Sequence, residues 1–158
     1  MKYITLFLIM PLLCNSQTYS ELMQITSEQS YIRYMVENGY SESESDSEMI
    51  RYRLYSRKNG GTKDWRVESR FDKSREFDII YLFYDFDFPT AKNKFDNIFN
   101  SIKANCDFVG VRVAISAVCY SCNWKGQYRR EFYIDNDARI GSISFGAFTF
   151  KPDYKNKF

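Results

Sequence analysis

The stretch MIRYRLYSRKNGGTKDWRVESRFD, residues 49–72, has the clearest structural pattern in the chain. In its first half, apolar Ile50, Tyr52 and Leu54 alternate with charged and polar side chains, and the same period of two continues in its second half. Between the halves, residues 59–61 (NGG) supply a turn, because Asn and Gly tolerate positive φ. The stretch therefore predicts a β-hairpin with one apolar face and one polar face.

The polar face of this hairpin is basic and includes a tyrosine. We expect it to carry Arg51, Arg53, Tyr55, Arg57, Arg66 and Arg70. Guanidinium groups bind phosphate, sulfate and carboxylate groups, so this face is a candidate anion-binding surface. Charge is also segregated along the chain, with seven acids and one base in residues 17–48 and 20 bases and 13 acids in residues 49–158. The alternative is an ordinary solvated sheet face that the acidic segment covers.

Further strands and a helix follow the hairpin. Residues 76–85 (EFDIIYLFYD) are apolar on both sides, which predicts an interior strand covered on both faces. Residues 90–106 have one apolar stripe at helical spacing. Period-two patterns then predict strands at 109–120, 125–135 and 139–151.

The segment before the hairpin is predicted to form helix followed by a linker. An apolar stripe predicts a helix over 19–38, or two short helices, with Ser20 able to cap the start. Residues 41–48 (SESESDSE) predict an acidic, Ser-rich linker. The chain is thus expected to form a single α+β domain over 17–158, a mainly antiparallel sheet of about six strands in two three-strand meanders with two helices packed on it.

The first 16 residues predict a signal peptide. Lys2 precedes an apolar run too short to span a bilayer, and small polar residues follow, so cleavage is expected after Ser16. The alternative is a lipoprotein anchored at Cys14, although the preceding Leu13 is bulky for such a signal. We expect a periplasmic or extracellular protein with no transmembrane segment after cleavage.

Composition excludes several classes of protein. The 158 residues are 44% hydrophobic and 27% charged, which excludes a disordered chain or a multi-pass membrane protein. Histidine is absent, which excludes Ser-His-Asp and Cys-His catalysis and His-ligated zinc. No glycine motif for dinucleotides, phosphates or a nucleophile elbow occurs, so no cofactor is indicated.

After cleavage three cysteines remain, Cys106, Cys119 and Cys122, and two of them are expected to pair in an oxidising compartment. Spacing alone leaves the pairing open. Cys119 and Cys122 form a CxxC, but it ends a predicted strand and enters the next turn rather than opening a helix, where the dipole would lower a thiol pKa. A structural disulfide is therefore favoured over a redox site, and three thiols without histidine disfavour zinc.

Two aspartates, Asp85 and Asp87, follow the apolar strand at 76–85. Carboxylates in such a place can hold a divalent metal. The other interpretation is a strand end with an Asp cap before the next helix, and it is favoured because a bare DxD is common by chance.

Together these features favour an exported, non-catalytic module that binds a protein or an anionic component of the cell envelope, with no nucleic-acid partner. The chain's 13 tyrosines suit recognition, since tyrosine combines large contact area with a polar tip. The alternative is a small exported enzyme, either a thiol–disulfide oxidoreductase at Cys119/Cys122 or a carboxylate-metal hydrolase at Asp85/Asp87.

Overall fold

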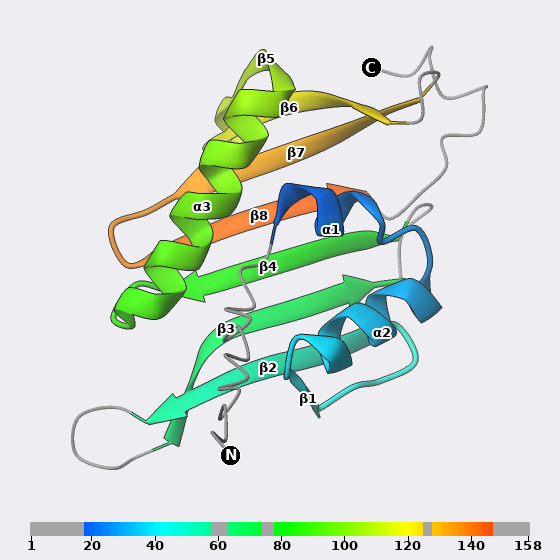
Figure 1. Cartoon of the computed structure of the whole chain (residues 1–158), viewed down its shortest axis with the longest axis vertical. Coiled ribbons are helices and arrows are strands. Elements are labelled where there is room, and N and C mark those ends of the chain that lie inside the picture. Colours follow the sequence, from blue (N-terminus) through cyan, green and yellow to red (C-terminus); the bar gives the residue numbers. More distant parts are fainter. Residues whose placement is uncertain (1–17, 58–62, 74–77, 125–127, 147–158) are drawn as a thin grey trace, which may run out of the picture.

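The computed structural model describes residues 18–57, 63–73, 78–124 and 128–146 (Figure 1). In chain order its elements are α1 Tyr19–Met23, α2 Glu28–Glu37, β1 Ser41–Ser43, β2 Met49–Arg57, β3 Lys63–Asp72, β4 Ile79–Asp85, α3 Pro89–Asn105, β5 Cys106–Arg112, the 3-10 turn η1 Val113–Ile115, β6 Ala117–Trp124, β7 Tyr128–Asn136 and β8 Ile140–Gly146. The predicted signal peptide and the end of the predicted strand 139–151 lie outside the described residues.

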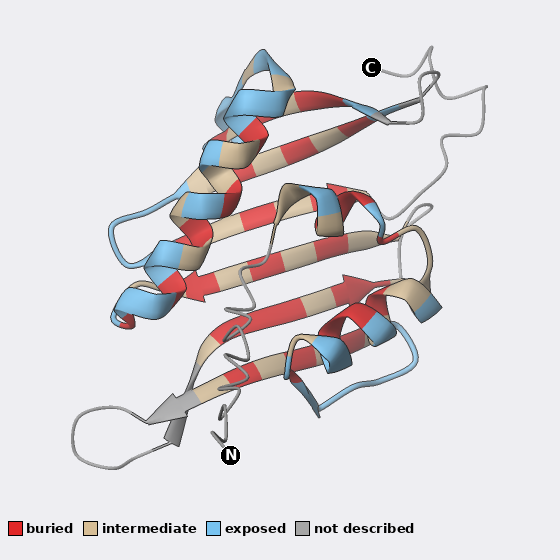
Figure 2. Cartoon of the chain, in the orientation of Figure 1, coloured by how far each residue is buried: buried red, intermediate tan, exposed pale blue. Residues whose placement is uncertain are grey.

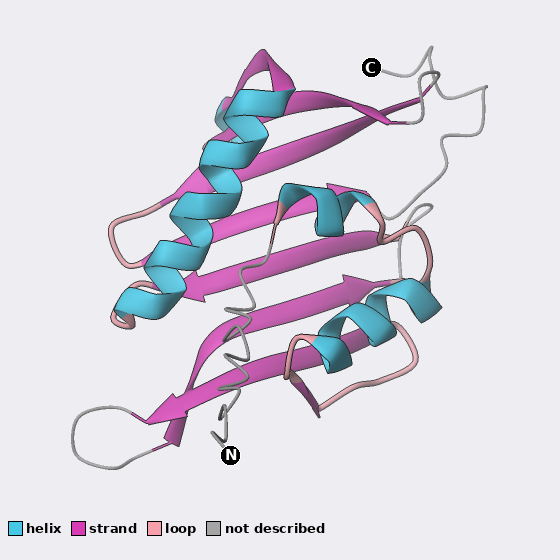
Figure 3. Ribbon diagram, in the orientation of Figure 1, coloured by secondary structure: helices cyan, strands magenta, loops and turns pink. Residues whose placement is uncertain are grey.

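All eight strands form one antiparallel sheet in the order β1-β2-β3-β4-β8-β7-β6-β5. Two four-strand meanders meet where β4 pairs with β8, and α3 carries the chain from β4 to the far edge strand β5 (Figures 1 and 3). The predicted α+β class and the arrangement in two antiparallel meanders are confirmed, although each meander has four strands rather than three. The predicted count of six strands and two helices is wrong, since the described residues form eight strands and three α-helices.

Both extra strands come from segments with misleading patterns. Part of the expected linker 41–48 is β1, which pairs with β2 through its backbone. The expected single strand 109–120 is instead the hairpin of β5 and β6. Its turn is η1, and Ser116 in the left-handed region (φ 51°) reverses the chain without Gly, Pro or Asn.

The predicted helix at 19–38 is two helices, as the alternative interpretation held. Thr18, not Ser20, caps α1, because its side chain accepts from Glu21 N while the Glu21 carboxylate accepts from Thr18 N. Ser27 caps α2 in the same reciprocal way with Ser30. Each capping pair satisfies backbone N–H groups that the first helical turn leaves unbonded, which fixes where the helix begins.

The hydrophobic core lies between the sheet and the three helices, which all cover one face (Figure 1). Strand register aligns buried side chains into rows that cross the sheet under the helices. One row is Ile50, Phe71, Ile80, Phe145 and Phe132, all buried. The period-two pattern of each strand therefore becomes the alternation of buried and half-buried residues seen in Figure 2.

No described helix lies on the opposite face of the sheet, which we call the open face (Figure 3). The strand predicted at 76–85 is central, as β4 between β3 and β8, but the described helices cover only one of its faces. On the open face it presents the half-buried side chains of Tyr81 and Phe83. Aromatic side chains on both faces thus explain why its sequence resembles a fully covered strand.

A buried arginine anchors the end of α1 to the sheet. Arg130 of β7 is 3% exposed and donates to the carbonyl oxygens of Leu22 (2.8 Å) and Ile25 (2.9 Å) at the end of α1. Its guanidinium also lies over the ring of Phe145. Burial lowers the pKa of Arg130 to about 10. Its hydrogen bonds offset part of the cost of burying this cation, and they occupy carbonyls that a helix end leaves unbonded.

Replacement of this guanidinium should destabilise the domain. We expect Arg130→Met to lower the free energy of unfolding by about 2–3 kcal/mol, because buried carbonyl oxygens lose a donor. Arg139→Met, at an exposed position in the β7–β8 turn, is the matched control and should change it by less than about 0.5 kcal/mol. Urea unfolding followed by circular dichroism measures both, and equal midpoints would contradict the role given to Arg130.

Candidate functional site

Three arginines of the open face converge on one carboxylate. We define the arginine cluster as Arg51, Arg53, Arg70 and Glu68, which share this face because Arg51 pairs with Arg70, and Arg53 with Glu68, across β2 and β3. The Nε atoms of Arg53 and Arg70 each lie 2.6 Å from a Glu68 oxygen, and Arg51 Nε lies 3.8 Å away. The cluster therefore holds two net positive charges around a buried anion.

Glu68 is the fixed centre of this cluster. Its side chain is 4% exposed, whereas those of the arginines are 22–39% exposed. Burial alone would raise the pKa of Glu68, but the hydrogen bonds and charges of Arg53 and Arg70 outweigh it, so the pKa lies below its usual value. An ionised Glu68 holds the two guanidinium groups by their Nε atoms and limits their rotamers, which preorganises them for a ligand.

Aromatic side chains extend the site across the sheet. The guanidinium of Arg70 lies 4.7 Å from the ring centroid of Phe83 on β4. Phe83 stacks nearly parallel with Tyr81, at 6.1 Å between centroids and 9° between planes. Ser142 and Ser144 of β8 pair with Phe83 and Tyr81, so they share the open face. This face therefore combines cations, flat aromatic surface and hydroxyl groups.

The structure brings together four of the six residues predicted for the basic face. Arg51, Arg53 and Arg70 belong to the cluster, and Tyr55 is hydrogen-bonded to Arg53. The side chain of Arg57 lies outside the described part of the chain.

Arg66 does not join the cluster, and this part of the prediction is wrong. Its guanidinium donates to Thr90 Oγ1 (3.2 Å) in the first turn of α3. The reason is a register shift at Leu54/Tyr55, where Val67 pairs with Leu54 and Trp65 with Tyr55, so Arg66 is an extra residue in β3. Such a bulge breaks the alternation of faces on which the prediction depended.

Sequence reasoning missed the acidic members of the site. Glu68 lies two residues before Arg70, and that spacing in a strand was the signal that the two share a face. Glu44, from the segment expected to be a linker, lies 3.6 Å from Arg51, and its side chain is 79% exposed. The acidic segment thus contacts the rim of the basic face.

The cysteine pairing left open by the sequence is resolved. Cys106 and Cys122 form a disulfide and lie directly opposite each other on β5 and β6, with Cα atoms 4.3 Å apart. Cys119 is a free, buried thiol. The CxxC lies within β6 rather than at a strand end, and Cys119 and Cys122 are not paired with each other. The disulfide is therefore a cross-strand link at the sheet edge.

The two aspartates of the DxD lie in a tight turn. Asp85 ends β4, and its Oδ1 accepts a hydrogen bond from Asp87 N (3.0 Å). The N-cap of α3 is Phe88, with no side-chain cap, so neither aspartate caps the helix. Within the described ranges no group of three or more Cys, Asp or Glu is placed to hold a metal ion. In the same ranges no helix has the length and apolar character needed to cross a membrane.

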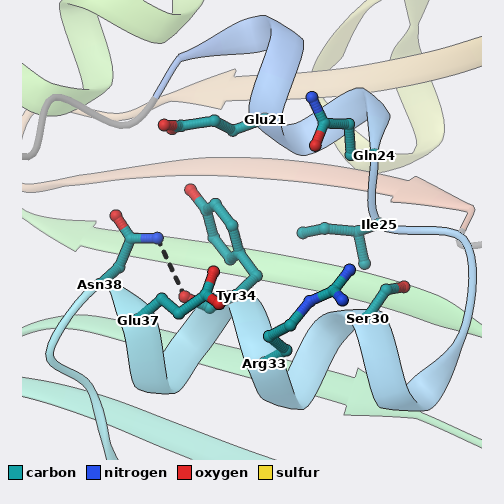
Figure 4. Close-up of a pocket in the computed structure, with 8 residues that line it drawn as sticks. All are labelled: Glu21, Gln24, Ile25, Ser30, Arg33, Tyr34, Glu37 and Asn38. Carbon is teal, nitrogen blue, oxygen red and sulfur yellow. Dashed lines mark hydrogen bonds between the residues drawn. The ribbon is translucent and has the colours of Figure 1, made fainter.

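A cleft of about 340 Å³ lies between α1 and α2 (Figure 4). Tyr34 points from α2 toward α1, and Glu21 and Gln24 form the opposite wall (Figure 4). The remaining lining residues are Ile25, Ser30, Arg33, Glu37 and Asn38. Several polar groups already have structural partners, since Glu21 binds Thr18 N and Asn38 Nδ2 donates to the Tyr34 carbonyl oxygen. With a single aliphatic residue in its lining, the cleft lacks the largely apolar wall typical of a small-molecule site.

Comparison of the chain with protein-family models, curated proteins and solved structures gives no match.

Stability should depend on pH through Glu68. The pKa of Glu68 is lowered from 4.5 on folding. Its ionised carboxylate therefore contributes fully to the free energy of unfolding above about pH 4.5, and this contribution is lost as the pH falls through the lower pKa of the folded state. We expect the difference in unfolding free energy between the wild type and Glu68→Gln to be largest above pH 4.5 and to shrink below it. Glu44→Gln, at the exposed rim, is the control and should have little effect. A difference independent of pH would contradict the ionised centre.

Thiol reactivity should separate the cysteines. Burial and the charge of Glu131 raise the pKa of Cys119, so its thiol is protonated and shielded in the native chain. In the chain cleaved after Ser16, iodoacetamide should add no group natively, one group in denaturant, and three only after reduction, as measured by intact mass. Rapid native alkylation of Cys119 would contradict this assignment.

Proposed function

We propose that this protein is an exported, non-catalytic binding module whose open sheet face binds an anionic component of the cell envelope. The observation that carries the proposal is the arginine cluster, which keeps two net positive charges on the open face, where no described helix lies. Glu68 contacts Nε of Arg53 and of Arg70, so their terminal nitrogens can form a bidentate contact with a carboxylate, sulfate or phosphate.

The surroundings of the cluster suit recognition of a polymer or protein surface rather than a small molecule. The site is a sheet face, and the cleft of Figure 4 lies between the helices on the other side of the sheet. Tyr55, Tyr81 and Phe83 add amphipathic and aromatic area near the guanidinium groups. A ligand with repeated anionic groups would match such an extended face.

Two features support export. The sequence begins with the pattern of a signal peptide. The cross-strand disulfide between Cys106 and Cys122 is of a kind that persists in oxidising compartments such as the periplasm or the extracellular space. Charge attraction outside the cytoplasm points to envelope polymers and proteins rather than nucleic acid.

Binding of dextran sulfate tests the proposal, with calorimetry at low and high salt. Arg70→Gln removes a cluster cation, lowers the net charge of the cluster from +2 to +1 and should weaken binding several-fold. Affinity should fall with ionic strength in every case.

Arg139→Gln removes the same charge from an exposed turn outside the cluster, so it controls for net charge alone. Equal weakening by Arg139→Gln and Arg70→Gln, or no binding by the wild type at low salt, would reject the arginine cluster as the site. Thermal melting of each variant confirms that folding is retained.

A further inference from the structure

The two edges of the sheet differ in character. The β1 edge is three residues long and carries Ser and Glu, which is how proteins commonly protect an edge from pairing with another strand. The β5 edge is seven residues long and apolar in its centre (CDFVGVR). Five of the seven exposed large hydrophobic residues in the described ranges lie on β5 and η1: Phe108, Val109, Val111, Val113 and Ile115.

This concentration of exposed apolar surface has the composition typical of an interaction site. The exposed fractions run from 52% for Val109 to 84% for Val113, and β5 is the last strand at its end of the sheet (Figure 1). Contiguous exposed apolar patches bordered by charged residues are typical of protein interfaces. Here Asp107 and Arg112 provide the charged borders, one toward each end of β5. The carboxylate of Asp107 also binds the guanidinium of Arg129 on β7, but its side chain is 79% exposed and can be reached from the edge.

The backbone of β5 also offers hydrogen bonds to a further strand. The 4.3 Å Cα separation of Cys106 and Cys122 is that of a non-hydrogen-bonded antiparallel pair. Alternation along β6 then makes Phe108/Tyr120 and Val111/Val118 pairs of the same kind, with Val109 as the extra residue between them. The N–H and C=O groups of Phe108 and Val111 therefore face away from β6, toward the open edge.

We propose that β5 pairs antiparallel with β5 of a second copy of this chain, about a two-fold axis between Val109 and Gly110. In this register Phe108 lies opposite Val111 of the second copy, and Asp107 lies opposite Arg112. Each apolar residue thus meets an apolar residue, and each charge meets the opposite charge, at both ends of the interface. Self-complementarity of this kind is what an isologous dimer requires.

In this register, residues that lie opposite each other have their side chains on the same side of the joined sheet. Asp107 and Arg112 pair with Ser121 and Ala117 of β6, which are four residues apart and so share one face. Phe108 and Val111 pair with Tyr120 and Val118, which share the other face. Beside the axis, Gly110 of each copy lies opposite Val109 of the other. Gly110 has no side chain, and the space where its Cβ would stand is empty, so the two backbones can approach there. The pairing would create one continuous sheet from the two copies.

Reversing the charges of Asp107 and Arg112, separately and in a mixture of the two variants, tests the proposed dimer. Asp107→Arg places two arginines opposite each other at both ends of the interface, and Arg112→Asp does the same with two aspartates. Each variant alone should dimerise roughly tenfold more weakly than the wild type, because opposed like charges replace opposed unlike charges twice. An equimolar mixture of the two variants should recover wild-type association, since every pair in the mixed dimer is again of opposite sign.

Sedimentation equilibrium of the full oxidised chain measures these dissociation constants. Arg139→Asp, an equal charge change at an exposed turn, is the control and should leave dimerisation unchanged. Val111→Lys tests the apolar part of the interface and should abolish the dimer. A wild type that remains monomeric into the millimolar range overturns the proposal, and so does a mixture that associates no better than either variant alone. Neither outcome depends on binding of dextran sulfate, so this test is separate from that of the arginine cluster.

Discussion

The pairing of β4 with β8 sets the path of the chain through the whole sheet. These strands are far apart in the chain, and their seven aligned residue pairs join two meanders into one sheet. Because β8 is the last strand and occupies the place beside β4, the chain leaving β4 must cross three strands before it can re-enter the sheet at β5. The helix α3 makes this crossing, and Gly141 of β8 allows it, since a Cβ there would lie 2.5 Å from the ring of Phe86 and 2.7 Å from that of Phe95.

The same topology determines where polar and charged side chains can be placed. With the helices on one face, every second residue of each strand lies on the open face, which tolerates arginines, serines and aromatic rings. A carboxylate as buried as Glu68 is stable there only because Arg53 and Arg70 supply charge and hydrogen bonds. On the covered face, the equally buried Arg130 is satisfied by helix carbonyls instead. The two buried charges therefore perform different tasks: Glu68 organises a surface, and Arg130 holds the end of α1 against the sheet.

Prediction from sequence succeeded where side-chain periodicity is the cause of the structure and failed where it is not. The hairpin at 49–72, the helix at 90–106 and the meander topology follow from apolar spacing. The strand β1 has no apolar residue and exists because its backbone pairs with β2, so periodicity could not reveal it. The turn at η1 is made by ordinary residues and Ser116 inside an apolar run, which hid the β5–β6 hairpin. Arg66 does not lie on the expected face, because one extra residue in β3 interrupts the alternation of side chains between the two faces. The disulfide partner of Cys122 depends on the register between β5 and β6, which the spacing of cysteines in the sequence does not determine.

Dimerisation through β5 would place two arginine clusters in a fixed geometry relative to each other. A two-fold axis perpendicular to the sheet keeps the open faces of both copies on the same side of the joined sheet. The arginine clusters lie on β2 and β3, six strand positions from the axis in each copy, so a flat-sheet count at about 4.8 Å per strand places them roughly 60 Å apart. A single small anion cannot bridge that distance, whereas a repeating anionic polymer can occupy both sites at once. The second contact would then be intramolecular and would raise the overall affinity without any new contact. Dimerisation would thus favour long anionic polymers over short fragments of the same chemistry, even though each cluster binds both equally.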